Sequence, residues 1–220
     1  VMYHPLYLQR VRDLCKRFEV HLVLDEIAVG FGRTGTMFAH QQARRPDGSG
    51  VKPDFICLSK GLTGGVLPLS CVLTTDEVYA AFYDYRTVHG FLHSHSYTGN
   101  PLACRAALAT LAIFDEDDVL AQNKRRAQRM TAALAPLAAH AQVKNFRQQG
   151  MIWAFDAQVN EPAKAATFSR RFFTTALEHE ILIRPIGRTV YLMPPYILSD
   201  DEIDLLATRL QTVFEQVIHA

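Results

Sequence analysis

The sequence predicts an α/β protein in which a mostly parallel sheet is covered by helices. Three short segments are almost wholly apolar, as strands are when both faces of their sheet are covered. They lie at residues 20–24, 55–58 and 69–74. Segments whose apolar residues recur at helical spacing flank them. This order of elements favours helices packed on both faces of the sheet.

Helix signals stand on either side of these strands. Residues 5–18 repeat their apolar side chains at helical spacing, and Pro5 suits a first turn. We expect a short helix over residues 76–83. A longer, alanine-rich helix is expected to begin at Asn100-Pro101, where Asn caps the helix and Pro takes its first position.

The pattern changes after about residue 118, where shorter strands mix with helices. Such mixing is typical of a smaller α+β domain. We therefore expect two domains, residues 1–117 and residues 118–220. In the second, helices are expected at residues 119–139 and 162–180 and after a capping box from Ser199 to Glu202, and strands at residues 151–155, 181–183 and 190–192.

Composition excludes several classes of protein. The chain has 220 residues, 49% hydrophobic and 20% charged, as globular proteins do. A formal net charge of +1 gives no electrostatic case for binding nucleic acid or an anionic membrane. No apolar run approaches the roughly 20 residues that span a bilayer, and the first residues do not resemble a signal peptide. The dispersed cysteines favour a cytoplasmic protein with reduced thiols.

Lys60 stands just beyond a predicted strand, at residues 55–58, and a glycine-rich turn follows it. In an open α/β sheet, ligands bind beyond the carboxyl ends of the strands. One interpretation is a partly desolvated lysine that acts as a nucleophile. The other is a solvated loop lysine, which this stretch alone favours because most lysines lie at protein surfaces.

Asp25 follows the strand predicted at residues 20–24. Its carboxylate points into the same crevice as Lys60 if the two strands are neighbours. One interpretation of the pair is a salt bridge. The other is a site for pyridoxal 5'-phosphate (PLP), where the lysine bonds the aldehyde and the acid pairs with the protonated ring nitrogen. The spacing alone leaves both open.

The segment from Gly30 to Gly35 matches the GxGxxG pattern of dinucleotide-binding sites. That fingerprint must itself form the turn from strand into helix. Here the first glycine comes several residues after Asp25, and no clear helix begins at Gly35. Asp54, the acid about 20 residues further on, begins a strand where the fingerprint needs an acid at a strand's end. The sequence therefore favours a loop without a dinucleotide.

His89, His93 and His95 lie close together in a polar loop, and imidazole is a common metal ligand. No Cys or carboxylate completes a ligand set within residues 87–99. We expect a polar loop that binds no metal.

Longer stretches carry a family resemblance. Residues 22–35, LVLDEIAVGFGRTG, and residues 58–65, LSKGLTGG, resemble the signature of class III aminotransferases, which are fold-type I PLP enzymes. The resemblance covers nearly all of the chain. Within the family, HSYTGNPLAC at residues 95–104, IRPIG at 183–187 and YLMPPY at 191–196 are similar to members that act in biotin biosynthesis.

The resemblance implies roles for individual residues. Lys60 would bind the cofactor covalently and move the proton between substrate and cofactor, and Asp25 would pair with the ring nitrogen. Ser96 would bond the cofactor phosphate of the neighbouring subunit of a homodimer, at a position where the family often has Thr. Arg184 would take the carboxylate of the oxo-acid substrate, which suits a guanidinium fork. Tyr191 would lie near the substrate.

For Arg184 the alternative is a surface salt bridge. A charge between an apolar segment and Pro185 is costly unless it is paired, which favours a ligand. Ile186 stands where some family members have Phe, so the pocket wall is expected to differ there.

The implied reaction moves an amino group from S-adenosylmethionine to 8-amino-7-oxononanoate, giving 7,8-diaminononanoate. Other possibilities stay open: a class III enzyme for an ω-amino acid or a diamine, an inactive fragment, and, more remotely, a dinucleotide-dependent oxidoreductase. Family members also carry a first half with a glycine/serine loop for the cofactor phosphate and an aromatic that stacks on the ring. Neither is found here, so we expect the chain to be the later part of a longer polypeptide.

Overall fold

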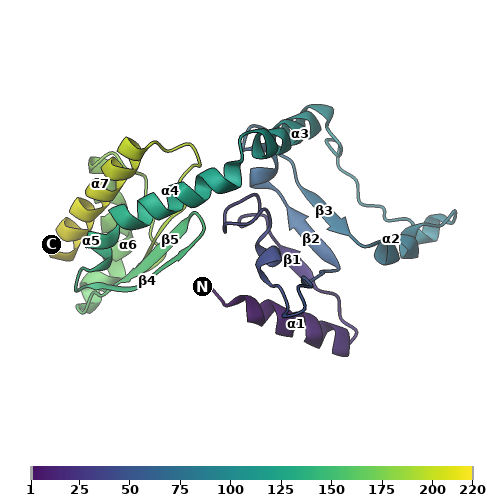
Figure 1. The fold of residues 1–220 in the computed structure, drawn as a ribbon, viewed down its shortest axis with the longest axis horizontal. Helices are drawn as coiled ribbons and strands as arrows, with labels where there is room; N and C mark the ends of the chain where they lie inside the picture. The colour runs from purple at the N-terminus through teal and green to yellow at the C-terminus, as the bar shows by residue number, and fades with distance from the viewer. Residues whose placement is uncertain (1, 220) are drawn as a thin grey trace. The chain divides into compact units, whose positions relative to one another are not determined.

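The computed structural model describes residues 2–219, which form two compact units divided between Leu120 and Ala121. The first unit runs from purple to teal in Figure 1, and the second runs from teal to yellow. None of the helices in the described part of the chain is long and apolar enough to cross a lipid bilayer.

The first unit contains a three-stranded sheet in the order β1-β2-β3, formed by β1 (Val23–Asp25), β2 (Phe55–Leu58) and β3 (Cys71–Thr74). β1 pairs with β2 in parallel, and β3 runs antiparallel to β2. β1 and β3 begin later than the sequence predicts. The amide of Val20 still bonds the carbonyl of Cys15 after the first helix. The carbonyl of Leu69 accepts the hydroxyl of Ser59 instead of a strand partner.

Six helical segments surround this sheet: α1 (Pro5–Arg17), η1 (Ala39–Gln42), η2 (Lys60–Thr63), α2 (Asp76–Phe82), η3 (Thr87–His89) and α3 (Pro101–Glu116). The predicted cap of α3 is confirmed, because Asn100 accepts the amides of Leu102 and Ala103. α3 packs against η2. The long helix is therefore placed directly on the turn that carries Lys60.

The first unit has two small clusters of buried apolar residues. One joins α1 to β1 through Leu8, Leu22, Ala43 and Val51, and the other comprises Phe31, Leu58, Leu62 and Ala107. Within the described residues, part of this sheet is left uncovered. Val23, Val72 and Leu73 are each more than half exposed, because no element of the described chain covers them.

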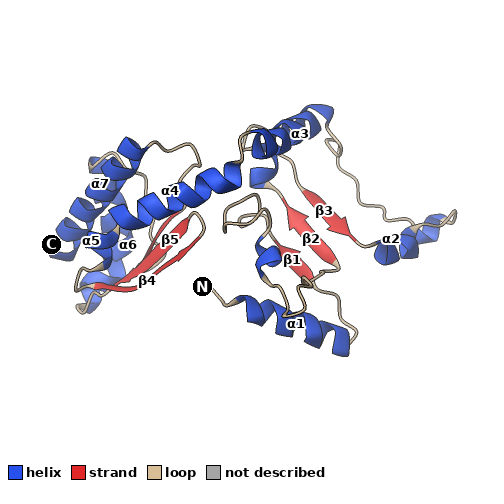
Figure 2. Ribbon diagram, in the orientation of Figure 1, coloured by secondary structure: helices blue, strands red, loops and turns tan. Residues whose placement is uncertain are grey.

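The second unit packs helices on one antiparallel sheet, as the ribbon in Figure 2 shows. Its elements are α4 (Val119–Ala133), α5 (Ala135–Ala138), β4 (Val143–Gln149), β5 (Ile152–Ala157), α6 (Pro162–Glu178), β6 (Thr189–Leu192) and α7 (Asp200–His219). The sheet order is β4-β5-β6. One large core lies between this sheet and the helices, with Trp153, Phe168, Phe172 and Phe214 almost fully buried.

Two predictions fail in the second unit, and one strand there was missed. The single helix predicted over residues 119–139 is broken at Leu134, because Pro136 has no amide to continue it. Residues 181–183 form no strand, although Ile181 and Ile183 are buried. β4 was not predicted at all. The capping box is confirmed. The Glu202 carboxylate accepts a hydrogen bond from the Ser199 amide at 2.8 Å, and the Glu202 amide donates one to the Ser199 hydroxyl.

Candidate active site

Asp25 and Lys60 lie at the same edge of the first sheet. Asp25 ends β1 and stands opposite Cys57 of β2, because the two strands are parallel. Lys60 follows the end of β2 by two residues. The prediction that the two strands are neighbours is therefore confirmed. Both side chains start from the carboxyl ends of adjacent parallel strands.

The backbone at Lys60 adopts an unusual conformation. Its φ angle is +47°, in the left-handed region that side-chain-bearing residues rarely enter. The surrounding turn maintains this angle, since the Ser59 hydroxyl donates to the carbonyl of Leu69 at 2.7 Å and the Thr63 hydroxyl to that of Leu67 at 2.6 Å. Backbone strain of this kind concentrates at functional sites. Lys60 is exposed within the described chain, so no described residue desolvates its side chain.

The turn after Lys60 packs on the loop that follows β1. Phe31 is 3% exposed, has a positive φ of 53° and lies against Gly61. A Cβ at Gly61 would lie 2.8 Å from the Cβ of Phe31, so only glycine fits without a shift. The two segments of the family signature are thereby locked together.

Glu26, next to Asp25, turns into the protein. Glu26 is only 2% exposed. Its carboxylate accepts hydrogen bonds from the Ala39 amide at 2.6 Å, the His40 amide at 2.9 Å and Nδ1 of the His40 ring at 2.7 Å. Burial alone would raise the pKa of Glu26, but the hydrogen bonds from His40 and Ala39 outweigh it and the pKa lies below its ordinary value. Sequence reasoning missed this role, because adjacent acids carry no signal of which one is buried.

The amide of Glu26 also donates to the carbonyl of Cys57 at 3.0 Å. This bond extends the pairing of β1 and β2 by one residue beyond Asp25. Asp25 itself accepts the amide of Ile27 at 3.0 Å. Its carboxylate is thus oriented by its own turn while remaining exposed.

The competing interpretations of these residues receive no support. No salt bridge joins Asp25 to Lys60 within residues 2–219. The glycine motif forms consecutive turns followed by the four-residue η1, so no helix opens at Gly35. Asp54 binds the guanidinium of Arg12 and accepts the amide of Leu22 at 2.6 Å. The geometry of a dinucleotide fingerprint is therefore absent.

The histidine loop is exposed over most of its length. His89 pairs with Asp84 through Nδ1 at 2.8 Å. No cluster of three or more His, Cys, Asp or Glu side chains in the described residues is placed to hold a metal ion. Ser96 lies in an exposed turn. Two hydrogen bonds between His95 and Thr98 close this turn. Among the described residues, no hydrogen bond joins Ser96 to Asp25 or Lys60.

Arg184 and Tyr191 belong to the second unit. Arg184 is exposed in the extended segment before β6, and neighbouring Pro185 is buried and accepts the hydroxyl of Ser169 at 2.6 Å. Arg184 makes no ion pair within residues 2–219, so the salt-bridge alternative is not supported there. Tyr191 lies half-buried on β6, opposite Ala154. The roles of both residues toward a substrate stay predictions.

A model of the family "Aminotransferase class-III" matches residues 1–214. The chain belongs to the class III aminotransferases. The two segments that resemble the family signature carry Asp25 at the end of β1 and Lys60 just beyond the end of its partner strand β2.

Individual relatives agree with this family. The adenosylmethionine-8-amino-7-oxononanoate aminotransferase of Helicobacter pylori is 42% identical over 98% of the chain and 49% of its own length. The crystal structure of the enzyme of that name from Methanocaldococcus jannaschii is 35% identical with a TM-score of 0.84, covering 96% of this chain and 49% of that one. This class III chain spans about half the length of the curated relatives it matches.

Another relative of known structure contains the cofactor. An amine transaminase from an uncultivated Pseudomonas species, in its PLP-bound form, is 31% identical with a TM-score of 0.83, and covers 96% of this chain and 48% of that one. PLP is accordingly the cofactor of the family to which this aminotransferase chain belongs. The likeness to these transaminases also confirms the predicted fold-type I α/β class.

Proposed function

We propose that this chain carries the lysine and the ring-nitrogen acid of a PLP-dependent aminotransferase. The observation that supports it most directly is the placement of Asp25 and Lys60 beyond the carboxyl ends of two adjacent parallel strands, within the family signature. Ligands of open α/β sheets bind at such edges. Family membership then supplies the class of chemistry.

The side chains at this edge fit the cofactor. PLP needs an amine for its aldehyde and an anion for its pyridinium nitrogen. Lys60 makes no ion pair in the described chain, so its amine is available, and the Asp25 carboxylate is exposed and oriented by the Ile27 amide. When bound, PLP supplies an electron sink and carries the amino group.

Each residue then has one task. Lys60 would hold the aldehyde of PLP and would move a proton at the substrate carbon. Asp25 keeps the ring nitrogen protonated through its negative charge. Arg184 takes a substrate carboxylate with its planar fork, and Tyr191 lines the substrate pocket. Ser96 supplies a hydroxyl to the phosphate of the neighbouring subunit, which makes the assembly a homodimer.

The finer proposal concerns the substrates. Relatives at 31–42% identity are named adenosylmethionine-8-amino-7-oxononanoate aminotransferases. We therefore assign S-adenosylmethionine as amino donor and 8-amino-7-oxononanoate as acceptor, with biotin biosynthesis in the cytoplasm as the setting. The second candidate is another class III transamination, because solved relatives also include amine and omega-transaminases.

The domain assignment belongs to the same proposal. Residues 1–117 supply part of the large cofactor-binding domain, and residues 118–220 supply the small domain. The compact units of the structure divide three residues later, at Leu120. The remaining half of the relatives' length would carry the phosphate loop and the stacking aromatic.

The 220-residue chain is loaded with PLP and mixed with 8-amino-7-oxononanoate and one donor at a time: S-adenosylmethionine, alanine, glutamate or a diamine. Mass spectrometry then follows 7,8-diaminononanoate. The full-length H. pylori relative serves as positive control, and Lys60→Ala as the negative one.

Product with S-adenosylmethionine alone supports the finer proposal. Product only with another donor retains the family chemistry and assigns a different donor. If the relative turns over and this chain gives no product with any donor, the chain is the inactive fragment that the sequence left as an alternative.

A further inference from the structure

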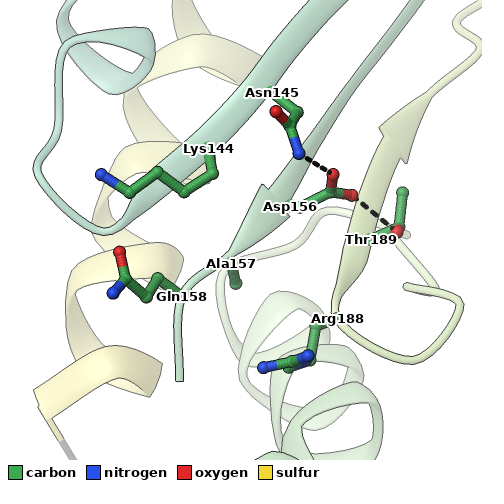
Figure 3. Close-up of a pocket in the computed structure, with 7 residues that line it drawn as sticks. All are labelled: Lys144, Asn145, Asp156, Ala157, Gln158, Arg188 and Thr189. Atoms are coloured by element: carbon green, nitrogen blue, oxygen red, sulfur yellow. Dashed lines mark hydrogen bonds between the residues drawn. The ribbon is translucent and has the colours of Figure 1, made fainter. Parts of the chain in front are cut away.

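A hollow of about 450 Å³ opens at one end of the sheet in the second unit (Figure 3). Its walls come from all three strands of that sheet or from residues directly beside them. They are Lys144, Asn145, Asp156, Ala157, Gln158, Arg188 and Thr189. This volume falls within the range of about 300–1,000 Å³ typical of small-molecule sites.

Strand register places the polar walls on one face. Lys144 pairs with Asp156 across β4 and β5, and Asp156 pairs with Thr189 across β5 and β6. Residues directly opposite each other share a face of the sheet. The neighbours Val143 and Ala157 point the other way and belong to the buried core. The row formed by Lys144, Asp156 and Thr189 therefore faces away from that core.

A bulge next to Lys144 shapes this end of the sheet. The register of β4 shifts between Lys144 and Arg147, and Asn145 takes a left-handed φ of +51°. This turn directs the Asn145 amide onto Asp156, where Nδ2 donates to Oδ2 at 3.0 Å. Bulges commonly re-aim side chains next to functional sites.

Asp156 is a scaffold and offers no free acceptor. Its Oδ1 accepts the Thr189 hydroxyl at 2.8 Å, and its Oδ2 accepts Asn145. The guanidinium of Arg147 spans both oxygens at 3.2 and 3.3 Å. Burial alone would raise the pKa of Asp156, but these hydrogen bonds and the charge of Arg147 lower it. The carboxylate is ionised and its charge is balanced by Arg147.

Two cationic side chains at the hollow, those of Lys144 and Arg188, form no ion pair with a carboxylate in the described chain. Within residues 2–219, the Lys144 ammonium has neither an ion pair nor a hydrogen bond. Arg188 makes one long side-chain bond, from its guanidinium to the carbonyl of Val159 at 3.4 Å. Figure 3 places Lys144 and Gln158 on one side of the end of β5 and Arg188 on the other, beside β6. The hollow is thus flanked by two unpaired positive charges and an amide.

We propose that this hollow binds a small organic anion with at least two negative charges, borne by phosphate or carboxylate groups. Lys144 meets one anionic group as a point charge, and the Arg188 fork takes the other in two parallel bonds. Gln158 completes the site as a neutral donor. The site lies wholly within the second unit and does not depend on the function proposed above.

Isothermal titration calorimetry of the full 220-residue chain tests the proposal. The probes are pyrophosphate and citrate, with acetate as the singly charged comparison. Saturable binding of pyrophosphate identifies phosphate as the preferred group, and binding of citrate identifies carboxylate. Because each cation contributes charge-assisted bonds, Lys144→Gln and Arg188→Gln are each expected to weaken binding about tenfold or more. Lys144→Glu should abolish it.

Matched controls separate a built site from general attraction. Lys124→Gln and Arg125→Gln remove the same charge from exposed positions of α4 and should leave the affinity within about twofold. Both pocket cations are exposed, so circular dichroism should show every variant folded. The proposal is overturned if neither polyanion binds saturably, if acetate binds as tightly, or if the α4 variants lose as much affinity as the pocket variants.

Discussion

A Cβ atom on Gly61 would lie 2.8 Å from the Cβ of Phe31, closer than two such carbons approach in folded proteins. Phe31 is almost fully buried and its backbone is already left-handed, so it has little freedom to retreat. The turn that presents Lys60 is therefore fixed by direct packing on the glycine-rich loop after β1. This contact joins the two segments that resemble the family signature.

The Gly61→Ala substitution is expected to destabilise the chain by about 1–3 kcal/mol, because the added methyl group overpacks the contact with Phe31. Urea denaturation followed by far-UV circular dichroism measures the loss. Gly50→Ala is the matched control, since nothing lies within 4 Å of a Cβ at that position. Equal midpoints for the two variants would refute the packing argument.

The buried Glu26 gives a pH-dependent prediction. Its pKa is lowered in the folded chain, so its contribution to stability is complete above the unfolded pKa of about 4.5 and disappears as pH falls through the lower folded value. Glu26→Gln places an NH₂ group against the Ala39 or His40 amide. We expect it to lower the free energy of unfolding by about 1–3 kcal/mol at pH 7.

Urea titrations from pH 7 down to pH 3 test the sign. The difference between the original chain and Glu26→Gln should shrink below about pH 4.5. Glu77→Gln, at an exposed position of α2, controls for loss of charge and should give no such difference. A gap that stays constant or widens toward acid pH would contradict the assignment.

Asp54 gives a stability prediction of a different kind. It joins α1 to the sheet by binding both Arg12 and the amide of Leu22, and the Arg12 side chain is only 14% exposed. Asp54→Ala leaves that guanidinium poorly solvated and unpaired, so we expect a loss of about 1–3 kcal/mol in urea denaturation. Asp13→Ala removes an acid paired with Arg45 at the surface and should change nothing measurable. Similar losses for both would show that burial does not decide the effect.

Asp25→Asn separates charge from shape at the cofactor edge. The amide can still accept the Ile27 amide, but it removes the negative charge opposite the ring nitrogen. We expect the transamination rate to fall by about 10²- to 10³-fold, while PLP affinity changes far less. Stopped-flow single turnover gives the rate, and fluorescence titration with PLP gives the affinity. Equal losses in both would mean that Asp25 only anchors the cofactor.

Much of the fold could be predicted from local signals. The caps at Asn100 and Ser199 are confirmed because a side-chain acceptor beside helix amides is a local feature. β4 was missed because its exposed positions are polar and the bulge at Asn145 breaks the two-residue alternation that marks a strand. Residues 181–183 show the reverse error, since their alternation reflects burial without a strand partner.

The part of the site that depends on residue types and on their order in the chain could be predicted. Asp25 and Lys60 follow apolar strands, and parallel pairing then places them at one edge. The Glu26–His40 contact depends on a loop folding back over 14 residues, which no local pattern specifies. The hollow beside Arg188 depends on strand register and on residues more than 30 positions apart, such as Asp156 and Thr189. Side-chain burial and strand register are the features of these sites that could not be predicted from the sequence.

Covalent labelling tests the central claim most directly. The chain is incubated with PLP, reduced with borohydride, digested and analysed by mass spectrometry. The pyridoxyl group should appear on Lys60 far ahead of other exposed lysines such as Lys16 and Lys52, and Lys60→Ala should remove that label without new labelling elsewhere. Labels spread evenly over the exposed lysines, or unchanged in Lys60→Ala, would contradict the assignment of Lys60 as the cofactor lysine.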